Sequence, residues 1–277
     1  MKPVRPILFA ASVLVASLTL PVRAASEADA VAGRNLAKRY ADAIVGIELV
    51  VTLKMKSGDR EQPPREQRIE VNGTVISASG LTVTSLAQVD PQATFDAMRA
   101  GGGGARGVEL VGVDFKEVKL RLADGKEVPA RFVLKDADLD LAFMAPEKNA
   151  EGAAADFPSF VNLDDAVEGS VLGSYFSVGR APKFLQRVPL VRSTELIGVV
   201  EKPRRFYLLT DTTPGAPFFN PAGKLLGIAL QNTSGGRSSL VVLPAADIAE
   251  MAKQASVAQT APAPGPAVPA PAPATGG

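Results

Sequence analysis

A succession of short segments that alternate between apolar and polar residues dominates this sequence. The clearest is "VKLRLADGKEVPARFVLKD" (118–136), where Val118, Leu120 and Leu122 alternate with polar residues before Asp124-Gly125. Asp-Gly is a strong signal for a two-residue hairpin turn, and this alternation places one face of each strand in a core. The segment therefore predicts an antiparallel hairpin. By the same alternation "IELVVTLKM" (47–55) predicts a half-buried strand.

Helices are expected only near the two ends of the chain. "EADAVAGRNLAKRYADA" (27–43) has apolar residues at helical spacing, and Pro244 stands before "AADIAEMAKQ" (245–254), where proline suits a first helical turn. Many short strands separated by turns, with almost no helix between them, predict an all-β barrel pair or sandwich. The further strand segments are "RIEVNGTVISASGLTVTS" with a turn at Ser79-Gly80, "LDLAFMAP", "SVLGSYFSVG", "RVPLVRSTELIGVV", "RFYLLTD", "GKLLGIALQ" and "SSLVVLP".

The first 24 residues have the pattern of a secretory leader. A basic head with Lys2 and Arg5 precedes an apolar run from Ile7 to Leu20, and cleavage is expected after Ala24. The apolar run is too short and poorly flanked for a membrane span, and without cysteine the leader cannot carry a lipid-anchored cleavage site. We therefore expect a periplasmic or secreted protein. With no disulfides available, its core alone must hold it together.

The charge balance narrows the class of partner. Without the leader the 30 basic residues fall to 27 against 29 acidic ones, a net charge of −2. This balance argues against nucleic acid and against anionic membrane surfaces as partners.

Three stretches lack the regular spacing of a strand or helix. Residues 90–116 contain the run Gly101–Gly104 and are read as an insertion or mobile loop. A linker at 146–156 divides the chain, and residues 255–277 form an Ala/Pro-rich tail that cannot bury a core. The expected organisation is leader (1–24), helix and first β unit (25–146), second β unit and helix (147–254), and tail (255–277).

Five of these segments, in this order, resemble the HtrA/Deg branch of the trypsin-like serine proteases over about residues 35–250. The resemblance implies two antiparallel six-stranded β-barrels with short N- and C-terminal helices, and no PDZ domain is expected after residue 254. The segments are "VNGTVISASGLTVTSLAQV", "VKLRLADGKEVPARFVLKDADLDLAFM", "VNLDDAVEGSVLGSYFSVG", "NPAGKLLGIAL" and "VVLPAADIAEMAK".

The resemblance also places the family's catalytic triad, and two of its three members are missing. The aspartate falls on Asp140, the histidine near Ala87 and the serine on Pro214. No shift of alignment restores the histidine, because the chain contains none. The loop that carries the serine in the family, Gly-x-Ser-Gly-x-Pro, corresponds here to Thr212, Thr213, Pro214, Gly215, Ala216 and Pro217.

These replacements remove the chemistry of a serine protease. A serine hydroxyl needs an adjacent base to become a nucleophile, and here both groups are absent. In the family the serine N–H is one oxyanion donor, whereas Pro214 has no N–H. The other donor position is held by β-branched Thr212, which fits poorly where unusual backbone angles are needed. Loss of triad members costs up to about a millionfold in rate. We therefore expect a pseudoprotease with a relic Asp140.

Other residues do not form an alternative catalytic or metal site. Thr213 lies beside the expected nucleophile but has no apparent base, and Ser85 or Ser177 would need a lysine at a spacing that the sequence lacks. Asp136, Asp138 and Asp140 lack the glycine-centred loop of a calcium site. We therefore expect no metal and no cofactor.

Three functions remain open at this stage. The first is a secreted peptide- or protein-binding module that uses the cleft between the barrels, in envelope protein quality control or its regulation. The second is an active serine-type hydrolase with a relocated nucleophile. The third is a structural envelope module tethered by its tail.

Overall fold

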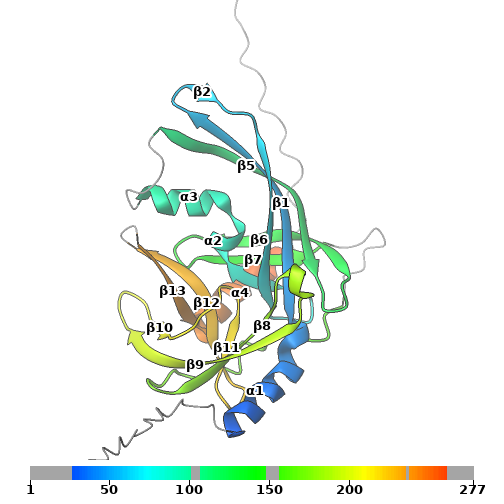
Figure 1. Ribbon diagram of the computed structural model, residues 1–277, viewed down its shortest axis with the longest axis vertical. Coiled ribbons are helices and arrows are strands. Elements are labelled where there is room, and N and C mark those ends of the chain that lie inside the picture. Colours follow the sequence, from blue (N-terminus) through cyan, green and yellow to red (C-terminus); the bar gives the residue numbers. More distant parts are fainter. Residues whose placement is uncertain (1–26, 101–106, 148–155, 235–236, 261–277) are drawn as a thin grey trace, which may run out of the picture.

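The computed structural model describes residues 27–100, 107–147, 156–234 and 237–260. The predicted leader, the glycine run 101–104, most of the predicted linker and residues 261–277 of the predicted tail lie outside these ranges. The described chain folds into two closed, six-stranded antiparallel β-barrels, as predicted (Figure 1).

The first barrel has the strand order β1-β3-β4-β7-β6-β5, and β5 closes it by pairing with β1. The short β2 (Arg60–Glu61) extends β1 at its tip. Along β1, Ile47, Leu49 and Val51 are buried while Glu48 between them is partly exposed, which confirms the predicted alternation. The six strands of this barrel are β1 (Ile44–Ser57), β3 (Arg65–Val75), β4 (Thr82–Ser85), β5 (Val108–Arg121), β6 (Glu127–Asp136) and β7 (Leu141–Pro146).

The second barrel has the order β10-β13-β12-β11-β8-β9 and closes on itself. Its interior is packed with aromatic and aliphatic side chains, among them Tyr175, Tyr207 and Phe218. Its strands are β8 (Ser174–Arg180), β9 (Pro189–Val200), β10 (Phe206–Leu209), β11 (Pro217–Phe219), β12 (Leu225–Ser234) and β13 (Arg237–Pro244).

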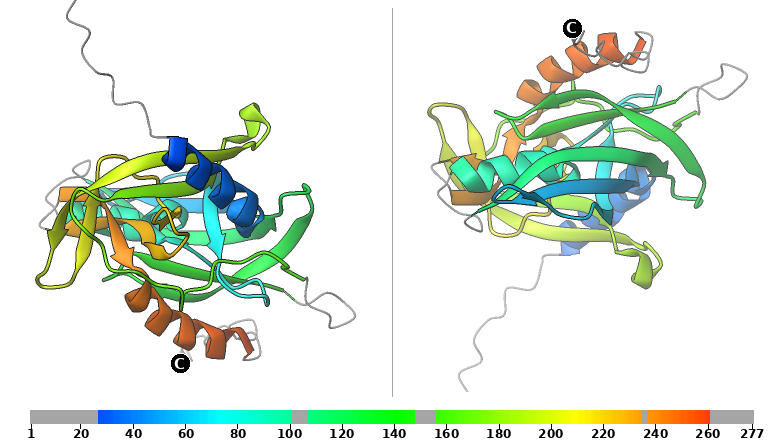
Figure 2. Two further views of the ribbon diagram at one scale, coloured as in Figure 1. Left: turned by 90° about the horizontal axis from the view of Figure 1, so that it is seen from below. Right: turned by 90° about the horizontal axis from the view of Figure 1, so that it is seen from above.

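Helices cover the outside of the barrels. α1 (Glu27–Tyr40) continues into a 3₁₀ turn at Ala41–Ala43, and α4 (Ala245–Thr260) lies on the opposite side of the molecule (Figure 2). Tyr40 at the end of α1 stacks on Phe219 of β11, with ring centroids 4.4 Å apart. Among the described residues, no helix is long and apolar enough to cross a membrane.

Two expectations about loops are wrong. Within 90–116 the described residues form α3 (Pro91–Ala100), which follows the short α2 (Leu86–Val89), and the first part of β5, which already begins at Val108. The C-terminal helix continues to Thr260 instead of ending at 254, because Ala252 and Ala255 still pack into the core between the barrels. The predicted tail therefore begins at least six residues later.

The β8–β9 connection contains a 3₁₀ turn at Lys183–Leu185. Two arginines bind this connection to the first barrel. Arg180 Nε donates to Ile44 O at 2.7 Å, and Arg187 pairs with Glu48 at 2.5 Å. Glu48 Oε1 also accepts a hydrogen bond from Arg121 Nε at 2.6 Å. Glu48 therefore joins both barrels through charge-assisted hydrogen bonds.

Glu48→Gln is expected to weaken this junction in a pH-dependent way. The hydrogen bond from Arg121, with the charge of Arg187 nearby, lowers the pKa of Glu48. Because the folded pKa is depressed, the stabilisation is present at neutral pH and is lost as the pH falls through that pKa. We expect a loss of about 1–2 kcal/mol in the free energy of unfolding at pH 7. Urea unfolding at pH 7 and pH 3 checks this, with the more exposed Glu117→Gln as control. An equal loss at both pH values would contradict it.

Candidate functional site

The segment at the predicted serine position is a tight turn. Ala216 N–H donates to Thr213 O at 3.1 Å. This hydrogen bond closes a four-residue turn with Pro214 and Gly215 at its two central positions. Gly215 has a φ of +78°. Proline followed by glycine with positive φ is the signature of a type II turn. Pro214 therefore suits the local backbone and provides no N–H.

This turn is held against the first barrel. Thr74 Oγ1 donates to Gly215 O at 2.7 Å, and Gly215 N–H donates to Ala229 O at 2.8 Å. A Cβ atom at position 215 would approach Asn72 O to 2.4 Å, so glycine is required here by contact as well as by φ. The N–H groups of both Gly215 and Ala216 are thus bonded to carbonyl oxygens of the protein.

Asp140 lies in the tight connection before β7, with a φ of +57°. Its Oδ1 accepts a hydrogen bond from Ala87 N–H at 2.7 Å, and its Oδ2 accepts one from Gln231 N–H at 2.8 Å. The Ser85 hydroxyl also donates to Oδ2. Burial raises the pKa of Asp140, and these three hydrogen bonds oppose that rise. The carboxylate thus joins α2 of the first barrel to β12 of the second.

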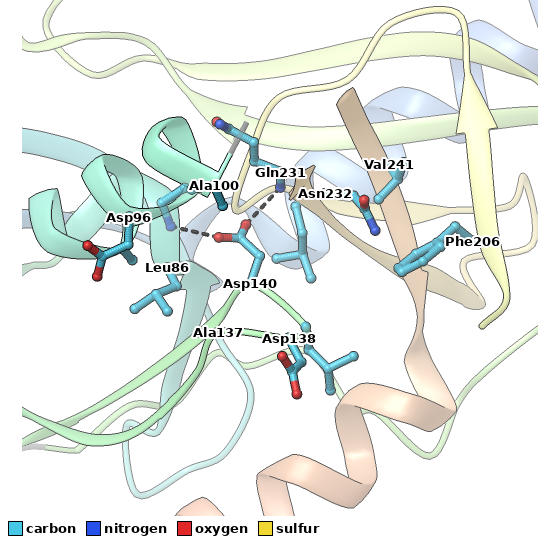
Figure 3. A pocket seen from close by; sticks show the side chains of 15 residues that line it. Leu86, Asp96, Ala100, Ala137, Asp138, Asp140, Phe206, Gln231, Asn232 and Val241 are labelled. Atoms are coloured by element: carbon cyan, nitrogen blue, oxygen red, sulfur yellow. Dashed lines mark hydrogen bonds between the residues drawn. The ribbon is translucent and has the colours of Figure 1, made fainter. Parts of the chain in front are cut away.

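A cavity of about 350 Å³ adjoins this carboxylate, and we call it the Asp140 pocket (Figure 3). Figure 3 shows Gln231 beside Asp140, with the hydrogen bond between them as a dashed line. α2 and α3 form one wall, and β12 and β13 form the other. Its lining includes Leu86, Ala97, Asp138, Phe206, Asn232 and Val241.

A second cavity of about 280 Å³ lies beside the turn, and we call it the Pro214 pocket. It too is shared by both barrels, with β3 and α2 on one side and β8, β9 and the turn on the other. Its lining includes Asn72, Gln88, Ser177, Arg192, Thr213 and Pro214. The predicted triad positions are therefore divided: Asp140 and Ala87 line one pocket, and Pro214 lines the other.

Comparison with protein families identifies this architecture. The model of the trypsin-like peptidase domain matches residues 71–228, which is more than half of the chain. The chain belongs to the trypsin-like peptidase domain family. No curated protein matches its sequence.

Two solved structures illustrate the likeness of this trypsin-like domain to known folds. The serine endoprotease from Yersinia pestis is 15% identical, with a TM-score of 0.52, over 81% of this chain and 66% of that one. The MamO protease domain from Magnetospirillum magneticum is 18% identical, with a TM-score of 0.47, over 76% of this chain and 96% of that one. At these identities the likeness concerns the fold alone.

The alternative nucleophiles have no lysine beside them among the described residues that line the two pockets. Ser85 is fully buried and its hydroxyl is bonded to Asp140. Ser177 and Thr213 line the Pro214 pocket, and no lysine is among the described residues that line either pocket. A Ser–Lys or Thr-based site therefore gains no support from this geometry.

Of the three acidic residues before β7, Asp136 and Asp140 make hydrogen bonds within the protein. Asp136 Oδ1 accepts the Leu139 N–H at 2.8 Å, and Asp138 is exposed. Within the described ranges, no group of three or more acidic residues is arranged to hold a metal ion.

Sequence reasoning missed two parts of the site. It did not predict α3, whose Ala93, Ala97 and Ala100 line the Asp140 pocket. It also gave no role to Asn72 and considered Ser177 only as a nucleophile. The apolar spacing within "PQATFDAMRA" (91–100) is the signal that could have found α3.

Proposed function

We propose that this chain is a secreted, non-catalytic member of the HtrA/Deg branch that binds extended peptides or partner proteins between its barrels. We place it in the periplasm or outside the cell, in envelope protein quality control or its regulation. The single observation that carries the proposal is a retained trypsin-like fold in a chain of 277 residues with no histidine.

The turn at the serine position supports the loss of catalysis. Pro214 offers no N–H, and the N–H groups of Gly215 and Ala216 bond to carbonyl oxygens within the protein. An oxyanion hole needs free donors that point at the developing charge. The donor that the family takes from the serine N–H is therefore missing at Pro214, and no histidine is present to act as the base.

The two pockets support retained binding. Both lie between the barrels, and both combine apolar walls with a few polar groups, as ligand sites do. The rigid barrels present these groups without needing the triad. Peptide recognition is therefore compatible with a site that has lost its chemistry.

Pro214→Ser is expected to restore no hydrolysis. The hydroxyl returns, but no histidine is available to accept its proton. Because proline at this turn position restricts the unfolded chain, the variant should lose about 0.4–1 kcal/mol in the free energy of unfolding. Chemical denaturation and a fluorescent casein assay check both statements. Casein cleavage by this variant above the wild-type level would contradict the account.

Binding is tested with a fluorescent pool of random nonapeptides and the purified chain, followed by anisotropy. We expect binding at micromolar concentration, weakened at least tenfold by Thr213→Trp, which fills the Pro214 pocket. Ser57→Trp, exposed at the far tip of β1, is the matched control and should bind as the wild type does. Absence of binding, or equal binding by both variants, would contradict the proposed site.

A further inference from the structure

Ser177 is a buried hydroxyl without a hydrogen-bond partner in the described part of the chain. It lies on β8, is 5% exposed, and shares a strand face with Tyr175, which packs inside the second barrel. Every fully enclosed side-chain nitrogen or oxygen among the described residues has a partner. The unpartnered Ser177 Oγ must therefore be reached from outside, through the Pro214 pocket that the residue lines.

A serine at this position leaves a hydrogen-bonding group open toward the pocket. An apolar residue would be expected on this inward face, whereas the Ser177 hydroxyl can donate to and accept from a group that enters the pocket. Thr213 and Gln88 line the same pocket, and neither side chain has a hydrogen-bond partner among the described residues. Asn72 donates through Nδ2 to Arg180 O at 3.0 Å, which leaves its Oδ1 as an acceptor.

The charged side chains that line the pocket form ion pairs or hydrogen bonds with other groups of the protein. The Arg180 guanidinium donates to Ile44 O, Ala41 O and Arg187 O and also pairs with Asp42. Glu70 pairs with Arg187 at 2.7 Å, and Arg192 pairs with Asp211 at 3.2 Å. The pocket therefore presents neutral hydrogen-bonding groups without an excess of either charge.

The size of the pocket limits what it holds. Its volume of about 280 Å³ falls just below the range of about 300–1,000 Å³ for drug-sized ligands. Val71, Leu190 and Ala216 add apolar wall between the polar groups. A single side chain of an extended chain fits this description.

We propose that the Pro214 pocket binds an uncharged hydrogen-bonding side chain of a peptide partner: Asn, Gln, Ser or Thr. The proposal rests on the proposed peptide-binding function and deepens it. A site built from buried hydrogen-bonding groups rejects an apolar analogue strongly, because its own groups are then left unpaired. Charged side chains are rejected because no unmatched counter-charge lines the pocket.

The test uses the full chain and fluorescent nonapeptide pools, each with one position fixed and the others random. At one position, pools fixed as Asn or Gln should bind at least tenfold more tightly than pools fixed as Leu, Lys or Glu. Ser177→Ala should reduce this preference three- to tenfold and leave the Leu pool unchanged. Ser193→Ala, exposed on neighbouring β9, is the control and should retain the preference.

The outcomes separate the two proposals. Equal binding of the Asn and Leu pools, a preference for Lys or Glu, or an unchanged preference in Ser177→Ala would overturn the pocket's specificity while peptide binding stands. Absence of binding by every pool would overturn both proposals. Thermal unfolding of each variant establishes that a lost preference is not a lost fold.

Discussion

Gly227→Ala is expected to destabilise the protein by about 3 kcal/mol. Gly227 lies in β12 opposite Pro244 of β13, where an added Cβ would stand 1.9 Å from Leu243 O. That oxygen belongs to the backbone of a paired strand, so the clash is relieved only by separating β12 from β13. Thermal and urea unfolding of the purified variant measure the effect.

The matched control is Gly198→Ala in β9 of the same barrel. There an added Cβ meets only the Leu208 side chain, at 3.5 Å, and the backbone is in ordinary strand conformation. We expect this variant to stay within about 0.5 kcal/mol of the wild type, as surface changes do. Equal stability of the two variants would contradict the described pairing of β12 with β13.

Asp140→Ala is expected to cost about 3 kcal/mol in stability. The change leaves the N–H groups of Ala87 and Gln231 and the Ser85 hydroxyl without their acceptor. Each unsatisfied buried group costs about 1–3 kcal/mol. Asp140→Asn also destabilises, since its NH₂ group must face at least one N–H. Asp138→Asn, exposed two residues earlier, is the control and should change little. Wild-type stability in Asp140→Ala would contradict the structural role.

The cost of Asp140→Asn is expected to depend on pH. Because burial raises the pKa of Asp140, ionising this group is less favourable in the folded protein than in the unfolded chain, so its contribution to stability falls as the pH rises through the folded pKa. The stability gap between wild type and Asp140→Asn should therefore narrow with rising pH. Urea unfolding at several pH values measures it, and a gap that widens would contradict the raised pKa.

Much of the fold was predictable because its strands are half-buried. The alternation around Asp124-Gly125 and along residues 47–55 indicates which faces enter the core, and β5, β6 and β1 follow it. The start of β5 was missed because its first residues, from Val108, are partly exposed and follow a glycine-rich stretch. α4 extends past 254 because small alanines pack against the barrels, a tertiary contact that composition does not reveal.

The site was predictable only in part. The motifs assign triad positions to Asp140, Ala87 and Pro214, but the division of these residues between two pockets depends on contacts across the barrels. Asn72 and Ser177 are more than 100 residues apart in the chain, and no local pattern links them. Their shared pocket arises from the packing of β3 against β8.

The central claim is that this trypsin-like domain has no serine-hydrolase chemistry. Its most direct test treats the purified chain from Ala25 onward with a serine-directed fluorophosphonate probe and, in parallel, with fluorescent casein. The account predicts neither labelling nor cleavage above a heat-inactivated control. Labelling or cleavage above that control would contradict the account and place a nucleophile outside residues 212–217.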